Sequence, residues 1–571
     1  MKHFSKLTHL ALVILLLTSC GLFESEDQKF EKVSSEFIEN YLTGHPTVAV
    51  AQGYHQFDGK LPDFSKEGID KEATHLNEFL AKFESLDTTK LSLNNLIDYY
   101  LLVSQVKNSL HRYNVLHIAE RPLTYLGIID LTPYVKRNYA SIDQRAKAVI
   151  HFEKQLPNFL VTAKQNMTSI NYKEEVELSI DAFRSTAEYV EKDIPKAFEK
   201  VYQKNLKDSL AYSTKIASRA LRGFADYLQK HTLPRAHGKY AIGRKNYIKM
   251  LQYNELLETT PEEILKIGLQ KLKEEQQEFA EAAKVIDSTK TPQEVFKMIQ
   301  KEHPKADSLV SFTKNKCEEI RQFLIDHRII TIPSEVRAKV VKTPAFMVGA
   351  TAAMDTPGPF EKAEASEAYY YVTPPSDKWT SAQKEEWLTL FNKYSTEVIS
   401  IHEAYPGHYV QFLHLNASSV SRARKLFGSY AFVEGWAHYT EQMMLEEGYG
   451  KSDDPKVMAK YKMAQLSESL LRLCRLVVSI KEHTAGWSVK EGTKFFMANC
   501  YYEEKPAYEE ALRGTFDPGY LSYSLGKLQL LALREDVKKR QGKYFSLRKF
   551  HDQATDNGML PIQLLRKILL N

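Results

Sequence analysis

His402-Glu403-Ala404-Tyr405-Pro406-Gly407-His408-Tyr409-Val410-Gln411 is the stretch from which the rest of the chain can be interpreted. A second group, Glu434-Gly435-Trp436-Ala437-His438-Tyr439-Thr440-Glu441, begins 26 residues after His408. Two histidines and a glutamate are the protein ligands of many catalytic zinc sites, and the fourth position is left for water. The glutamate beside the first histidine is where such sites keep their general base. The two groups therefore predict zinc bound by His402, His408 and Glu434, with Glu403 as the base.

The spacing of the two histidines does not fit an unbroken helix. The common zinc motif has its histidines four residues apart on one helix face, but Pro406 occupies that position here and His408 follows two residues later. At about 100° per residue, a regular helix would place His408 roughly 120° away from His402. Pro406 cannot continue the helix, and Gly407 permits unusual backbone angles. We expect a broken helix that turns His408 back toward His402; the alternative is two histidines with no ligand role near a helix end.

The segments on both sides predict apolar helices. The helix expected after Thr380 has one apolar face beside His402, formed by Phe391, Tyr394, Val398 and Ile401. Glu434 and Glu441 are two turns apart, so they lie on the same side of the second helix. A carboxylate on so apolar a helix needs a partner, because burying it unpaired costs several kcal/mol. We expect Glu441 to accept a hydrogen bond from a ligand histidine, and His438 is an alternative ligand.

These residues resemble a bacterial protein family. His402-Glu403-x-x-Pro406-Gly407-His408-x-x-Gln411, followed by Glu434-Gly435-Trp436-Ala437-x-Tyr439-x-Glu441, is similar to the "domain of unknown function 885" family, which is grouped with the gluzincin metallopeptidases. Weaker landmarks, which extend the resemblance through nearly the whole mature chain, lie at residues 53–58, 357–360, 486–488 and 518–527. Since the family admits an apolar residue at the position of His438, the resemblance favours leaving His438 out of the ligand set.

The resemblance also implies a fold and further site residues. It implies a mainly α-helical, elongated zincin-like peptidase fold of two lobes around a deep cleft, with a small β-sheet near the zinc helix. Related peptidases supply a tyrosine or histidine from late in the chain to the oxyanion; Tyr523 is our first candidate and His483 our second. Arg513, with Tyr520 nearby, is the candidate for binding a substrate carboxylate. The alternatives are a core tyrosine at position 523 and a structural ion pair at Arg513.

Prolines interrupt the helical pattern between about residues 329 and 375, where strands are expected at 336–341 and 368–373. Gluzincins bind extended peptide along a sheet edge, and such backbone pairing tolerates many sequences. We take the strand that carries Tyr370 and Tyr371 as this edge; the alternative is a core hairpin. The small residues of 349–354 would let a substrate approach closely.

Elsewhere the pattern is helical. Apolar residues recur at three- and four-residue spacing in segments 30–41, 91–113, 141–166, 174–202 and 210–228. Thr260 and Thr291 each precede proline and an acidic turn, which is typical of a helix start. No linker, low-complexity tract or repeat divides the chain. We therefore expect residues 30–571 to form one α-helical domain.

The first residues predict export. Lys2 and Lys6 precede an apolar run of eight residues, then Thr18-Ser19-Cys20, the pattern of a secretory signal too short to span a bilayer. Leu17 to Cys20 resembles a bacterial lipobox, which implies a signal peptide over 1–19, a lipidated Cys20 and a tether over 20–29. Gly21 after the cysteine favours the outer membrane, facing the periplasm or the cell surface. The alternative is a soluble secreted protein.

Charge and cysteine content exclude other classes. The full chain has a net charge of +5, and removing Lys2 and Lys6 with the signal leaves 75 basic against 72 acidic residues, or +3. Such a balance gives no reason to expect nucleic acid. Cys317, Cys474 and Cys500 have neither disulfide nor metal spacing and predict small buried residues.

Taken with the resemblance, these observations predict zinc-dependent hydrolysis of peptide bonds in oligopeptides by a lipid-anchored envelope enzyme. One alternative is a zinc hydrolase for another amide, such as a cell-wall fragment. The other is a lipoprotein that keeps the fold as a binding or export module without catalysis.

Overall fold

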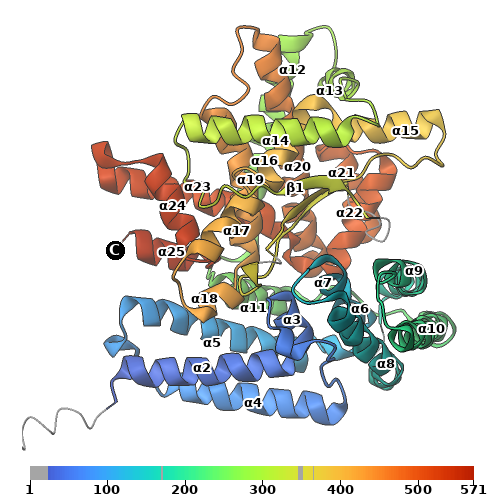
Figure 1. Ribbon diagram of the computed structural model, residues 1–571. Helices are drawn as coiled ribbons and strands as arrows, with labels where there is room; N and C mark the ends of the chain where they lie inside the picture. Colours follow the sequence, from blue (N-terminus) through green and yellow to red (C-terminus); the bar gives the residue numbers. More distant parts are fainter. Residues whose placement is uncertain (1–23, 169–170, 345–350, 364–365, 571) are drawn as a thin grey trace, which may run out of the picture.

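The computed structural model describes residues 24–168, 171–344, 351–363 and 366–570, so the expected signal peptide and Cys20 lie outside the described part. Within it the chain is mainly α-helical, with one small sheet (Figure 1). The first half of the chain contributes helices at one end of the molecule: α2 (Glu26–Gly44), α3 (Pro46–Ala51), α4 (Lys66–Glu84), α5 (Leu93–Asn114), α6 (Pro122–Ile128), α7 (Thr132–Lys136), α8 (Ile142–Asn166), α9 (Lys173–Ala197) and α10 (Lys204–Tyr227).

The predicted helices of this half are present, with shifted ends. α2 begins at Glu26, inside the segment expected to be a tether, because Ser25 caps it with a reciprocal Ser25–Gln28 pair. α9 ends at Ala197 rather than near residue 202, two residues after Pro195. Proline lacks the N–H that a helix interior needs, so the helix does not continue far beyond it.

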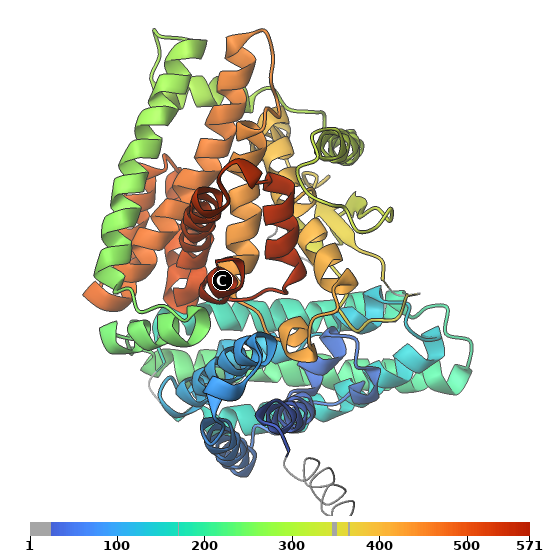
Figure 2. The same ribbon diagram turned by 90° about the vertical axis from the view of Figure 1, so that its left-hand side faces the viewer.

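The remaining helices make up the rest of the molecule together with the sheet. They are α11 (Arg244–Glu255), α12 (Pro261–Ile286), α13 (Pro292–Gln300), α14 (Leu309–Asp326), α15 (Ser381–Leu388), α16 (Lys393–Glu403), α17 (His408–Ala417), α18 (Arg422–Leu426), α19 (Tyr430–Glu446), α20 (Pro455–Ala485), α21 (Val489–Asn499), α22 (Glu504–Phe516), α23 (Ser522–Gln541), α24 (Leu547–Asp556) and α25 (Ile562–Leu569). Of these, α14 and α16 contact the sheet. Thr260 and Thr291 cap α12 and α13 as the sequence predicts. The long α12 lies along α20 (Figure 2), where Gly268 leaves room for Leu476.

The sheet differs from the prediction in its order. β1 (Lys339–Lys342), β3 (Tyr369–Val372) and β2 (Ala352–Asp355) pair in that order, β1 parallel and β2 antiparallel to β3. Tyr370 and Tyr371 therefore lie on the central strand, and the expectation that their strand is the edge was wrong. β3 is central because β2 pairs with its second edge. The sequence did not predict β2, because Ala-Ala-Met has little intrinsic preference for a strand.

One apolar core connects the two ends of the molecule. It includes Phe37 near the start of the described chain, Ile401 and Trp436 from the centre, and Leu565 near the end. The loop after β2 also packs closely against the end of α3, because a side chain at Gly358 would lie 2.4 Å from the backbone of Ala51. The helices that carry the predicted ligands are thus packed within a continuous structure.

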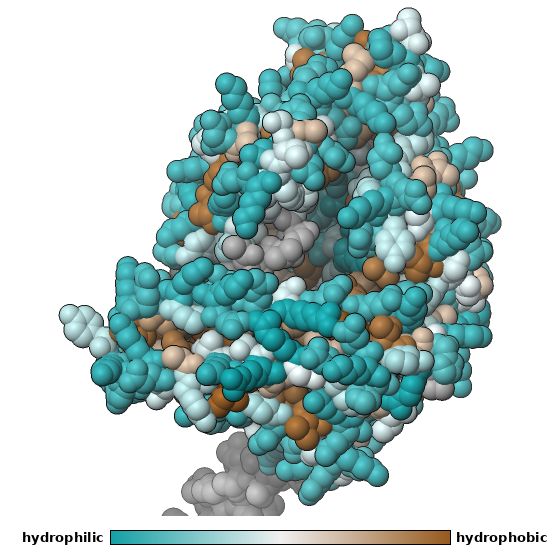
Figure 3. Space-filling model, turned by 90° about the vertical axis from the view of Figure 1, so that its right-hand side faces the viewer, coloured by the Kyte–Doolittle hydropathy of each residue, from teal (hydrophilic) through white to brown (hydrophobic). Residues whose placement is uncertain are grey.

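The face shown in Figure 3 is mostly hydrophilic and is hollowed near its centre. Among the described residues, no helix has the length and apolar character needed to cross a membrane. Cys317, Cys474 and Cys500 are buried free thiols, as predicted.

Glu482 is an unusual feature of α20. Its side chain is fully buried, and neither carboxylate oxygen has a hydrogen-bond partner among the described residues. Burial raises the pKa of Glu482 to about 9. Because the folded chain then holds a proton that the unfolded chain releases above its ordinary pKa, the free energy of unfolding should fall as pH rises toward 9.

Glu482→Gln should remove this pH dependence. The stability of the variant relative to wild type should rise between pH 5 and pH 8, at roughly 1.4 kcal/mol per pH unit at most. Denaturant midpoints at both pH values measure it. The matched control is Glu510→Gln, which breaks two 2.7 Å hydrogen bonds with Arg475 and should destabilise the protein at both pH values. If the free energy of unfolding of Glu482→Gln changes with pH just as that of the wild type does, Glu482 is not protonated in the folded protein.

Candidate metal centre

Three predicted ligands converge in the structure. One donor atom each from His402, His408 and Glu434 lies within 4.8 Å of the other two. Both histidines direct Nε2 at the same oxygen, Glu434 Oε2, at 3.6 Å from His402 and 3.5 Å from His408. Tetrahedral zinc ligands at about 2.1 Å from the ion are about 3.4 Å apart. The donor types and the two histidine–glutamate separations therefore fit a metal ion that takes nitrogen and oxygen ligands, such as zinc.

The two histidines meet because the helix breaks between them. α16 ends at Glu403 and α17 begins at His408, and the amide of Gly407 donates back to the carbonyl of Ile401 at 3.0 Å. A side chain at Gly407 would lie 1.7 Å from the carbonyl oxygen of His402, so this approach requires glycine. The indole of Trp436 donates to the carbonyl of Pro406 at 2.9 Å and fixes the turn.

The helix that carries His402 is shorter than predicted. α15, capped by Thr380, stops at Leu388, and α16 starts again at Lys393. Asn392 has extended backbone angles, and its side chain accepts from the amide of Ser395, which begins the new helix. The sequence-based expectation of one helix after Thr380 was therefore wrong at this point.

Close backbone contact sets the position of the third ligand. Glu434 lies on α19, and the next residue, Gly435, packs against Gly526 of α23. A side chain at Gly526 would lie 1.8 Å from the carbonyl oxygen of Ala431. This contact brings Tyr523, one turn before Gly526, beside the ligands, with its ring stacked near His402 at a centroid distance of 6.5 Å.

Glu441 is a fully buried carboxylate behind the ligands. One oxygen accepts from Nδ1 of His402 at 2.7 Å and lies 3.5 Å from a guanidinium nitrogen of Arg472. The other accepts from Nδ1 of His438 at 3.0 Å. Burial would raise the pKa of Glu441, but Arg472 and the histidines hold it well below its ordinary value. Burial lowers the pKa of His438 to about 3, so that ring is neutral and is oriented toward Glu441.

The charges around the ligands favour a cation. Burial lowers the pKa of His402, but Glu434 and Glu441 outweigh it and raise the value to about 9. Burial raises the pKa of Glu434, yet His408 and His402 hold it well below its ordinary range. A site that stabilises an added proton between two carboxylates also stabilises a metal ion there.

The expected base, Glu403, is attached to the edge of the sheet. Its Oε2 accepts from the backbone amide of Met354 on β2 at 2.9 Å, and the side chain is half-buried. The next strand residue, Asp355, pairs with Arg137 at 2.5 Å and Lys136 at 3.1 Å. Lys136 and Arg137, from the first half of the chain, thus help to fix the strand that orients Glu403. The sequence did not reveal this contact.

The structure places Tyr523 beside the ligand His402 and Arg513 against the ring of Tyr523. Tyr523 is 9% exposed, and its ring meets that of Tyr430 edge-on at a centroid distance of 5.8 Å. Arg513 lies over its ring, 5.8 Å from the centroid. Arg513 also donates from Nε and Nη2 to Asp517, and from Nη2 to the hydroxyl of Tyr430 at 3.1 Å. The ion pair named as the alternative role of Arg513 is therefore present, and the binding of a substrate carboxylate by Arg513 stays a prediction.

The other candidates are sealed in the interior. Tyr520, Tyr370 and Tyr371 are at most 3% exposed, so their side chains have no free surface for a substrate. His483 uses both ring nitrogens on backbone groups: Nε2 donates to Gly514 and Nδ1 accepts from Ile242. Burial lowers the pKa of His483 to about 4. These contacts give His483 a structural role and leave no nitrogen for an oxyanion.

Comparison with known families gives a match to "Bacterial protein of unknown function (DUF885)" over residues 46–569. The chain belongs to the DUF885 family. This DUF885 protein is also similar to a solved structure described as a "putative lipoprotein of unknown function" from Shewanella oneidensis, with 25% identity, a TM-score of 0.79, and coverage of 95% of this chain and 100% of the other. A "putative lipoprotein" from Colwellia psychrerythraea shares the fold at 18% identity and a TM-score of 0.80, with coverage of 96% and 99%. No curated protein matches the chain.

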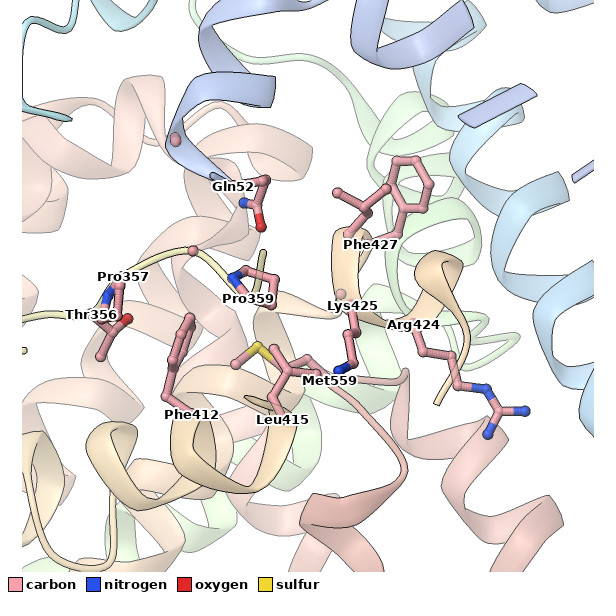
Figure 4. Close-up of a pocket in the computed structure, with 14 residues that line it drawn as sticks. Gln52, Thr356, Pro357, Pro359, Phe412, Leu415, Arg424, Lys425, Phe427 and Met559 are labelled. Atoms are coloured by element: carbon pink, nitrogen blue, oxygen red, sulfur yellow. The ribbon is translucent and has the colours of Figure 1, made fainter. Parts of the chain in front are cut away.

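The DUF885 fold also contains a pocket apart from the metal group (Figure 4). It has a volume of about 240 Å³ and lies between α17, α18 and the loop after β2. Its walls mix apolar side chains, among them Phe412, Leu415 and Met559, with polar and charged ones from Gln52, Arg424 and Lys425. None of His402, His408 and Glu434 lines it, so this pocket is not the metal centre.

Proposed function

We propose that this DUF885 protein is a zinc-dependent peptidase that hydrolyses oligopeptides. The convergence of His402 and His408 Nε2 on Glu434 Oε2, with Glu403 next in sequence to the first ligand, is the observation that carries the proposal. A bound zinc ion would supply Lewis acidity and lower the pKa of water at the open position. The same arrangement of two histidines, a glutamate ligand and a neighbouring base serves gluzincin peptidases, which the motif resembles.

Each residue then has a defined task. Glu403 takes the proton of the attacking water and passes it to the leaving amine. The Met354 amide holds one oxygen of Glu403, which leaves the other free for the proton. The hydroxyl of Tyr523 donates to the oxyanion that forms when water adds to the scissile carbonyl.

The proposed substrate is an extended peptide that follows the edge of β2. Because the Met354 N–H points away from β3 toward Glu403, the outer side of β2 faces the reaction site. Peptide backbone pairs with such an edge without regard to sequence. Arg513, whose Nη1 is not used by Asp517 or Tyr430, would bind a carboxylate of the substrate. A two-lobed fold around a cleft, formed by residues 30–571 as one domain, belongs to the same proposal.

The test is a digest of a peptide library by purified protein, with and without a chelator. Cleavage that stops on chelation and returns with zinc supports the proposal. Release of cell-wall fragments without peptide cleavage would favour another amide as substrate. Binding of peptides without turnover would favour a module that keeps the fold for binding or export.

We further propose that Cys20 carries a lipid and anchors the enzyme in the cell envelope, at the outer membrane. The lipobox-like sequence and the similarity to proteins described as lipoproteins support this. Cys20→Ser should move the protein from the membrane fraction to the soluble fraction or leave it unprocessed, because the anchor depends on one thiol. Fractionation with labelled fatty acid measures the change. If Cys20→Ser takes up as much labelled fatty acid as wild type and stays in the membrane fraction, Cys20 is not the lipidated residue.

A further inference from the structure

Arg472 of α20 lies between the carboxylate that orients His402 and the ring of Tyr523. A guanidinium nitrogen is 3.5 Å from Glu441 Oε1, the atom that accepts from His402. The guanidinium carbon is 5.6 Å from the centre of the Tyr523 ring. The ring of Tyr523 in turn stacks near His402. Each of these four residues therefore contacts two of the others.

The arginine is held firmly in this position. Its side chain is 9% exposed, and Nη1 donates to the carboxylate of Glu468 at 2.6 Å and to the backbone carbonyl of the same residue at 3.0 Å. Glu441 has no exposed surface and receives Arg472 and two histidines. A fully buried carboxylate needs such fixed donors, and an arginine supplies charge with a planar set of N–H groups.

We propose that Arg472 is a positioning residue that holds Glu441 against His402 and Tyr523 beside the ligands, and thereby sets the affinity of the site for zinc. The inference rests on the proposed metal site. Partners behind metal ligands typically change metal affinity by about 10–100-fold when they are removed. Arg472 acts on the ligand His402 indirectly, through Glu441. It also lies against the ring of Tyr523.

The neighbouring arginine offers a matched control. Arg475 lies on the same helix and over the same ring, 5.1 Å from its centre. It forms a two-point pair with Glu510 and contributes no contact to Glu441 among the described residues. The two arginines therefore separate the contact with Glu441 from general packing against Tyr523.

The experiment measures zinc affinity by competition with a chromogenic chelator, without substrate. Arg472→Met should weaken binding by about 10–100-fold, Arg472→Lys should recover part of it, and Arg475→Met should stay within about threefold of wild type. Equal losses at both arginines, or wild-type affinity in Arg472→Met, would overturn the proposal. If Arg472→Met does not fold, Glu468→Gln gives a second variant, since it loosens Arg472 without removing it, and an unchanged affinity there counts against the proposal.

The readout also separates this inference from the proposed function. A wild-type protein that binds zinc but cleaves no peptide would reject the peptidase proposal, while the affinities of the arginine variants would still decide the role of Arg472. Where peptides are cleaved, Arg472→Met should lower kcat more than it changes KM, because Tyr523 contributes to the transition state.

Discussion

Glu403→Gln is expected to abolish peptide hydrolysis while the protein keeps its zinc. The amide has nearly the size of the carboxylate, and its oxygen can still accept from Met354, so the end of α16 should not move. It cannot take a proton from water. Loss of a general base typically costs about 10²–10⁴-fold, and since Glu403 should also deliver the proton to the amine, we expect the upper end or beyond. Initial rates on a peptide and metal content measure both effects.

Glu434→Gln provides the comparison. A neutral amide is a poor replacement for a charged ligand, so this variant should lose zinc itself. The pair of variants therefore separates the base from the ligand. If Glu403→Gln cleaves peptides within about threefold of wild type, Glu403 is not the base and the mechanism fails with it.

Gly407→Ala is expected to destroy the metal site. The added carbon would lie 1.7 Å from the carbonyl oxygen of His402 and 2.5 Å from that of Ile401, both of them backbone atoms that cannot rotate away. The turn must open to accept it, and His408 then moves away from His402. We expect zinc affinity to fall by at least about 100-fold, together with a lower melting temperature.

Gly127→Ala is the matched control, because a side chain at that helical glycine would meet no atom within 4 Å. It should leave zinc affinity unchanged and stability equal or slightly higher. Zinc affinity in Gly407→Ala equal to that in Gly127→Ala would show that the close contact at Gly407 does not hold the histidines together.

Local chemistry made the main elements predictable. Proline and glycine between His402 and His408 indicate a broken helix, and two turns between Glu434 and Glu441 indicate one helix side. Capping residues such as Thr260 and Thr291 mark helix starts in the same way. In each case the residues that determine the structure lie within a few positions of one another.

Long-range packing accounts for what the sequence did not reveal. β2 exists because β3 pairs with it, so Tyr370 and Tyr371 moved from a predicted edge to the centre of the sheet. The Met354–Glu403 hydrogen bond joins segments 49 residues apart, and the position of Arg472 depends on how α20 packs against α19 and α23. Spacing along the chain carries no signal for such contacts.

Anomalous diffraction from crystals of protein purified without chelator tests the central claim most directly. Data on both sides of the zinc absorption edge identify the element and place it. We predict one zinc peak within about 2.1 Å of His402 Nε2, His408 Nε2 and Glu434 Oε2. No peak at these atoms in protein supplied with zinc, or a zinc ion bound elsewhere with the two histidines free, would contradict the account.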